Sequence, residues 1–121
     1  MMQNPYQKYM NQVVTTMTPA QLLIALYDKA ITELNKAILY IEDKNIPKAH
    51  NSIVRVSEIV DALDASLKEK YEISDNLAAL YEFFREQLVQ ANIKKDPEIL
   101  KSLIPFFQDL HDSFEEASKK L

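Results

Sequence analysis

The 121-residue sequence contains no cysteine and no glycine. Without cysteine it can form neither a disulfide nor a thiolate metal site, which is compatible with a reducing compartment. Without glycine it cannot build the glycine-rich loops that hold phosphate groups in P-loop and dinucleotide-binding proteins. Tight β-hairpins usually need glycine as well, so its absence also argues against a strand-rich fold.

The sequence also has no excess of positive charge. Its net charge is −4, and its lysines are spread along the chain rather than gathered in one stripe, so we expect no binding to nucleic acid. No apolar run is long enough to span a bilayer, and the first residues do not read as a signal peptide. We therefore expect a cytoplasmic protein that does not insert into membranes.

Side chains that carry catalysis or bind metals form no recognisable pattern. The two histidines, His50 and His111, belong to no H-E-x-x-H motif. A di-iron bundle needs glutamate three residues before each histidine, but those positions hold Pro47 and Gln108. We therefore predict that the protein is not an enzyme and has no catalytic residue, metal site or cofactor.

Apolar residues, by contrast, make up 47% of the sequence and recur with helical spacing. They predict four helices over about 19–43, 45–70, 74–92 and 96–121, joined by short links that make successive helices antiparallel. In the third helix, the apolar row expected to face the bundle is Leu77, Tyr81, Phe84, Leu88 and Ala91. The predicted fold is all-α: an antiparallel up-down four-helix bundle with a short N-terminal arm or helix packed on it.

The start of the first helix is marked strongly. In Thr18-Pro19-Ala20-Gln21, the Thr18 and Gln21 side chains can each bind the other's backbone N–H, and proline suits the first helical position. Asp96 and Pro97 predict a similar start for the last helix. We therefore divide the chain into an arm, residues 1–17, and a bundle, residues 18–121.

Two features predict local irregularities. Pro105 lies inside the last helix, where proline removes a hydrogen bond, so a kink is expected there. Because the chain has no glycine, Asn45 and Asn92 are the best candidates for the left-handed residues that end helices.

The arm has its own apolar pattern, since Tyr6, Tyr9, Val13 and Met17 recur at helical spacing. A segment of this length is too short for a stable isolated helix. We therefore expect the arm to dock weakly on the bundle, so that a better ligand can displace it.

Several short motifs resemble the flagellar secretion chaperone family, FliS. They are Asn4-Pro5-Tyr6, Tyr9, Val14, Thr16, Thr18-Pro19, Leu22, Leu26-Tyr27-Asp28, Asn76-Leu77, Leu80-Tyr81, Leu88, Ala91-Asn92 and Asp96. The resemblance covers essentially the whole chain. The sequence departs from the family at Lys29, where glycine is common, and at Phe114, where tryptophan is common.

The resemblance implies a chaperone in the bacterial cytosol that binds the disordered C-terminal segment of flagellin in hydrophobic grooves. Binding would block premature polymerisation and support flagellar type III export. Our candidates for the flagellin-binding groove are Leu22, Leu26, Tyr27, Ile59, Leu63, Leu77, Leu80 and Tyr81. Our candidates for an N-terminal cover that flagellin displaces are Tyr6, Tyr9, Val13 and Val14. Export-gate proteins, other flagellar regulators and a second copy of the chain stay open as further partners.

One alternative function uses a helical histidine. A four-helix bundle of this size could be a histidine phosphotransfer module with His50 as the phosphate acceptor. Such modules usually carry lysine and glycine soon after the histidine, whereas this sequence continues with Asn51-Ser52-Ile53-Val54. The residues therefore favour the chaperone over the phosphotransfer module.

Overall fold

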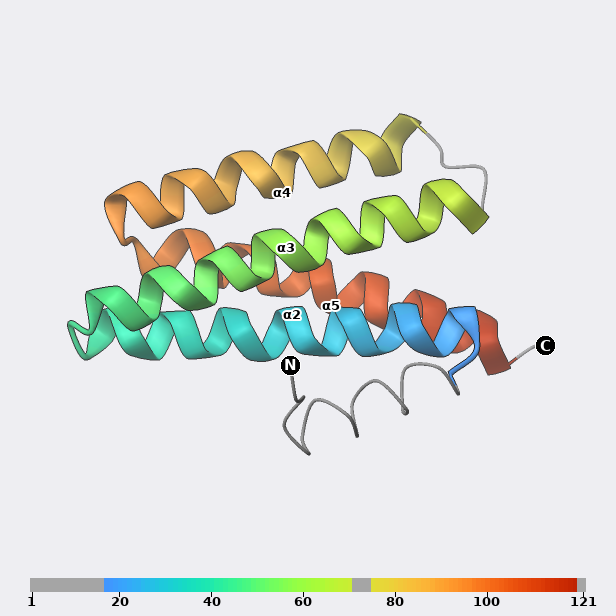
Figure 1. Cartoon of the computed structure of the whole chain (residues 1–121), viewed down its shortest axis with the longest axis horizontal. Helices are drawn as coiled ribbons and strands as arrows, with labels where there is room; N and C mark the ends of the chain where they lie inside the picture. Colours follow the sequence, from blue (N-terminus) through green and yellow to red (C-terminus); the bar gives the residue numbers. More distant parts are fainter. Residues whose placement is uncertain (1–16, 71–74, 120–121) are drawn as a thin grey trace, which may run out of the picture.

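The structure, a computed structural model, describes residues 17–70 and 75–119. In these two ranges it contains four α-helices and no strand: α2 (Pro19–Glu42), α3 (Ile46–Lys70), α4 (Asp75–Lys94) and α5 (Pro97–Lys119). Successive helices run in opposite directions (Figure 1). The predicted all-α four-helix bundle is confirmed, and the expected docking of the arm falls outside the described residues.

Two helices begin as the sequence predicts. At the start of α2, the Gln21 N–H donates to Thr18 Oγ1 over 3.2 Å, and the Thr18 N–H donates to Gln21 Oε1 over 3.0 Å. Pro19 occupies the first helical position. At the start of α5, Asp96 Oδ1 accepts from the Glu98 N–H over 2.9 Å. Each cap satisfies backbone N–H groups that the helix itself cannot pair.

The helix ends differ from the prediction. Among the described residues, those with positive φ are Lys44, at 59°, and Lys95, at 49°, whereas we expected Asn45 and Asn92. Asn45 instead starts α3, because its side-chain oxygen accepts from the Lys48 N–H over 3.3 Å. Lys95 suits the end of α4 because its ammonium group donates to the Asn92 carbonyl over 2.6 Å. That bond satisfies one of the carbonyls left unpaired at a helix end.

The four helices enclose one apolar core. α2 packs closely against α3 and α5, whereas α4 packs against the same two helices less extensively. The largest fully buried side chains are Tyr27, Tyr81, Phe84, Phe107, Leu23, Leu34, Ile53, Leu63, Leu67, Leu88, Leu100 and Leu103. The bundle therefore has one closely packed helix and, diagonally opposite it, one loosely packed helix.

Pro105 does not end α5, which continues as one helix from Pro97 to Lys119. The proline is exposed, so its ring lies on the outer side of the bundle. It removes the N–H that would bind the Lys101 carbonyl. The kink that we expect at this position stays a prediction.

Candidate partner-binding surface

The predicted groove residues divide into two groups in the structure. Tyr27, Leu63 and Tyr81 are completely enclosed, and Ile59 lies at the edge of the core with 9% of its surface exposed. The four half-buried residues are Leu22, Leu26, Leu77 and Leu80. Only this second group is both apolar and accessible. The predicted cover residues Tyr6, Tyr9, Val13 and Val14 lie outside the described residues.

The two enclosed tyrosines bind each other across the bundle. Their hydroxyl oxygens are 2.8 Å apart, which joins α2 to the diagonally opposite α4. Burial raises the pKa of both phenols, so both stay neutral. The Tyr27 ring also stacks on Phe114, with ring centres 5.7 Å apart. In this arrangement the pair lies in the core and links α2 to α4.

The half-buried leucines of α2 belong to a row that borders α3. Leu22, Leu26, Lys29 and Glu33 follow one another at steps of three or four residues, so they share one side of the helix. The Glu33 carboxylate lies 3.8 Å from the Arg55 guanidinium on α3. This contact shows that the row runs along the boundary between α2 and α3.

α3 presents a matching row of Arg55, Ile59, Ala62 and Ser66, also at steps of three or four residues. Because α2 and α3 are antiparallel, the apolar members of both rows lie beside the start of α2, and the charged members lie further along it. We call the surface formed by these two rows the α2–α3 face. It has an apolar end and a charged end.

The charged end is built around a buried carboxylate. Glu33 is only 1% exposed, and its Oε1 lies 3.3 Å from Lys29 Nζ and 3.6 Å from Lys36 Nζ. Burial by itself would raise the pKa of Glu33, but the two lysines hold it below its usual value. Glu33 therefore stays charged, which fixes α2 against Arg55 of α3.

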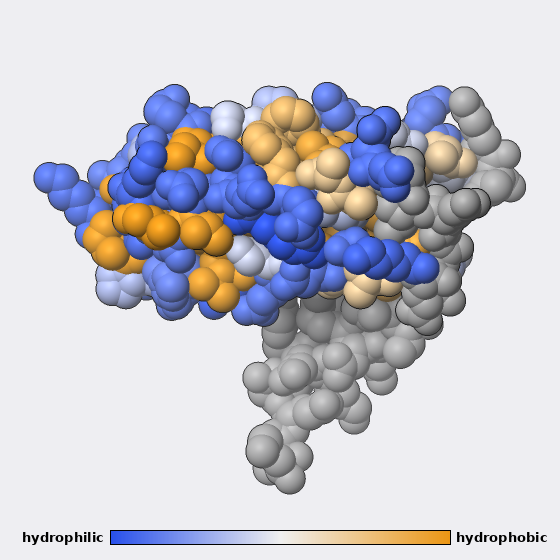
Figure 2. Space-filling view, turned by 90° about the horizontal axis from the view of Figure 1, so that it is seen from above, coloured by the Kyte–Doolittle hydropathy of each residue, from blue (hydrophilic) through white to orange (hydrophobic). Residues whose placement is uncertain are grey.

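α4 exposes apolar side chains that sequence reasoning missed. Phe83 is 38% exposed, Val89 54% and Ile93 73%. Phe83 lies against exposed Phe106 of α5, with ring centres 5.7 Å apart. None of the three belongs to the apolar row predicted to face the bundle, and that mismatch was the signal that could have revealed them. Figure 2 shows hydrophobic areas among hydrophilic ones over this side of the molecule.

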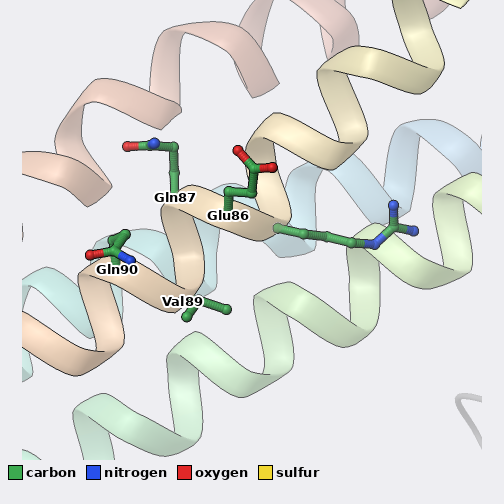
Figure 3. A pocket seen from close by; sticks show the side chains of 5 residues that line it. Glu86, Gln87, Val89 and Gln90 are labelled. Carbon is green, nitrogen blue, oxygen red and sulfur yellow. The ribbon is translucent and has the colours of Figure 1, made fainter.

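Two shallow hollows meet at Val89, which points towards α3 (Figure 3). One hollow has a volume of about 430 Å³, and its lining residues are Arg85, Glu86, Gln87, Val89 and Gln90. The other has a volume of about 340 Å³, and its lining residues are His50, Val89, Asn92, Ile93 and Lys95. The first hollow therefore lies along α4, and the second lies between His50 of α3 and the end of α4.

Arg85 connects α4 to α3 through ion pairs. Its guanidinium lies 2.8 Å from Asp64 Oδ2 and 3.0 Å from Asp61 Oδ1, both on α3. It also lies 2.6 Å from Glu82 Oε1 on its own helix. The hydrogen bond from Arg85 holds the pKa of Asp64 below its usual value. One side chain thus supplies most of the polar contact between α3 and α4.

His50, the phosphate acceptor of the alternative prediction, is exposed near the start of α3. The Asn92 amide nitrogen donates to its Nδ1 over 3.0 Å, while Lys95 donates to the Asn92 side-chain oxygen over 2.8 Å. His50 therefore ties α3 to the end of α4. Phosphate transfer by this residue stays a prediction.

Residues 17–70 and 75–119 contain no group of three or more histidine, cysteine, aspartate or glutamate residues placed to hold a metal ion. No helix in them combines the length and hydropathy needed to cross a membrane.

Together these features define an all-α four-helix bundle whose apolar residues are incompletely covered where its helices meet. The family model described as "Flagellar protein FliS" matches residues 2–121. The chain therefore belongs to the FliS family.

The relatives found by comparison carry the name flagellar secretion chaperone FliS. The protein of Bacillus subtilis (strain 168) is 30% identical over 115 residues, which cover 95% of this chain and 86% of the relative. The Salmonella typhimurium protein is 26% identical over 117 residues, covering 94% and 87%. The Escherichia coli (strain K12) protein is 28% identical over 107 residues, covering 86% and 79%.

Proposed function

We propose that this protein is a flagellar export chaperone that binds the disordered C-terminal segment of flagellin. It acts in the bacterial cytosol without catalysis, blocks premature polymerisation of flagellin and supports export through the flagellar type III apparatus. The observation that carries the proposal is the family match over residues 2–121, together with relatives named flagellar secretion chaperones.

The surface of the bundle supports this function physically. An amphipathic helix can dock by laying its apolar side on an apolar face of a partner. The α2–α3 face offers Leu22, Leu26 and Ala62 for such contacts, and α4 offers Leu77 and Leu80 beside its neighbours. A disordered segment that folds on binding gains this burial but loses part of the gain to its own ordering.

The N-terminal arm is the proposed competitor for the same surface. Tyr6, Tyr9, Val13 and Val14 would cover apolar residues of the free chaperone, and flagellin would displace them. Export-gate proteins and other flagellar regulators are further proposed partners, and the arm is the proposed route to a homodimer.

Isothermal titration calorimetry with a peptide of the flagellin C-terminal segment tests the proposal. The full chain should bind the peptide, and a chain lacking residues 2–16 should stay folded and bind with altered affinity. Leu26→Ser, in the α2–α3 face, should weaken binding. Leu39→Ser on the same helix should not, because Leu39 is 61% exposed and lies outside that row. Absence of binding by the full chain would refute the proposed function.

A further inference from the structure

The charged end of the α2–α3 face carries more positive charge than its own structure needs. Three cationic side chains converge on the single carboxylate of Glu33. The side chains of Lys29, Lys36 and Arg55 are 53%, 46% and 56% exposed, whereas that of Glu33 is 1% exposed. The negative charge is therefore enclosed, and the positive charges form the surface above it.

The donors of these cations are only partly used. Arg55 lies 3.8 Å from Glu33 Oε2, which is beyond hydrogen-bonding distance, and Glu33 Oε2 accepts no hydrogen bond within the described part of the chain. A guanidinium carries five N–H donors and an ammonium carries three. Lys29 and Lys36 both contact Glu33 Oε1, so their ammonium groups lie close enough for one incoming carboxylate to reach both.

The cations lie at a defined spacing along the face from its apolar end. Leu22 and Leu26 precede Lys29 on the same side of α2, and Glu33 lies one turn further along. Lys29 and Arg55 thus lie roughly one to two helical turns, about 5–10 Å, from the centre of the apolar end. A helix lying along this face would contact apolar side chains at one end and cations at the other.

We propose that the α2–α3 face recognises an amphipathic helix that carries aspartate or glutamate one or two turns away from its apolar residues. The apolar residues pack on Leu22, Leu26 and the exposed Ala62, and the acidic side chain pairs with Lys29, Lys36 and Arg55. The inference rests on the proposed function, because it specifies which part of the exported segment this face binds. Charge complementarity, and not apolar contact alone, sets the register of the partner helix.

The test replaces the three cations together with Glu33, so that no unpaired carboxylate is left in the interior. The variant Glu33→Gln/Lys29→Gln/Lys36→Gln/Arg55→Gln lacks the cluster altogether. The control Lys94→Gln/Lys101→Gln changes the net charge equally at exposed positions far along the chain. Calorimetry with the flagellin C-terminal peptide should show about tenfold weaker binding for the cluster variant at low salt, and a flatter salt dependence. The control should bind like the unchanged protein.

A second peptide, with its aspartates and glutamates changed to amides, turns the test into a double-mutant cycle of two proteins and two peptides. It should bind the unchanged protein about as weakly as the original peptide binds the cluster variant, and the variant should not distinguish the two peptides. The single substitution Arg55→Gln, at a half-exposed side chain, should show part of the loss without endangering the fold.

The outcomes separate this inference from the proposed function. If the cluster variant binds the original peptide as tightly as the unchanged protein, with the same salt dependence, the inference is wrong and the chaperone function stands. If the unchanged protein and the control both fail to bind, the proposed function is wrong and the inference falls with it.

Discussion

α2 and α4 lie diagonally opposite in the bundle, contact the same two neighbours, and do so in different ways (Figure 1). α2 buries Ala30 and Ala37 along with larger residues, and these small side chains let α3 and α5 approach closely. The buried residues of α4 are mostly large: Tyr81, Phe84 and Leu88. They bridge a wider separation, which leaves apolar side chains exposed at the edges of α4.

The comparison indicates a division of roles. α2 holds the bundle together, and its α3 side adds a surface with an apolar end and a charged end. α4 closes the core with fewer contacts and leaves Phe83, Val89 and Ile93 accessible. A partner helix could rearrange the edges of α4 at a lower cost than those of α2, because fewer packed contacts would be lost.

The largest expected effect compares two fully buried leucines, Leu34 of α2 and Leu88 of α4. Leu34→Ala should lower the free energy of unfolding by about 3–5 kcal/mol, because close neighbours cannot fill the cavity. Leu88→Ala should cost about 2–3 kcal/mol, because the loosely packed α4 can move inward. Urea unfolding followed by circular dichroism measures both. Equal costs would remove the proposed difference in rigidity.

The next effect concerns the hydrogen bond that joins the two helices. Tyr27→Phe should cost about 1–3 kcal/mol, because it leaves the enclosed Tyr81 hydroxyl without its partner. The double substitution Tyr27→Phe/Tyr81→Phe should cost less than the sum of the single ones, since neither hydroxyl is then left unpaired. Strict additivity in a double-mutant cycle would show that the two hydroxyls act independently.

A smaller effect contrasts the ion pairs of the two helices. Arg85 binds the buried Asp64 at 2.8 Å, and Lys68 lies 3.3 Å from the same carboxylate. Arg85→Gln should therefore lower the free energy of unfolding by about 1–2 kcal/mol. Arg55→Gln should cost about 0.5 kcal/mol or less, because Lys29 and Lys36 still neutralise Glu33. Reversed magnitudes in denaturant titrations would mean that the Glu33 cluster depends on Arg55.

Structural features that depend on neighbouring residues could be predicted from the sequence, and features that join distant residues could not. The caps at Thr18 and Asp96 depend on neighbours two or three residues away, so they were predictable. The pairing of Tyr27 with Tyr81 joins residues 54 positions apart, and no local pattern indicates it. The family resemblance led us to place both tyrosines in the groove. In the structure each phenol bonds the other inside the core, which gives it the polar partner that a buried phenol favours.

The candidate surface was predictable only in part, for the same reason. Leu22 and Leu26 were found because α2 carries more apolar residues than one buried side needs. Glu33 and Arg55 were not found, because their meeting depends on the alignment of α2 with α3. Lysine at the two helix ends was also unexpected. At Lys95 the side chain itself pairs the free carbonyl of Asn92, which offsets the cost of a left-handed backbone.

The smallest predicted effect is a pH dependence located where α2 meets α5. His111 of α5 is 9% exposed, and its ring nitrogens lie 2.9 Å from Asp112 and 3.1 Å from Asp28 of α2, with Glu115 at 3.8 Å. The hydrogen bond to Asp112 and the nearby carboxylates raise the pKa of His111. Its stabilising contribution should therefore be complete below about pH 6.5, the unfolded value, and be lost as the pH rises through the folded value.

Denaturant titrations between pH 6 and pH 9 test this, with His111→Gln as the variant and His50→Gln as the control. The unchanged protein and the control should lose stability across this range, whereas His111→Gln should lose little, because a neutral amide does not titrate. If His111→Gln kept the full slope, the pH dependence would come from another group.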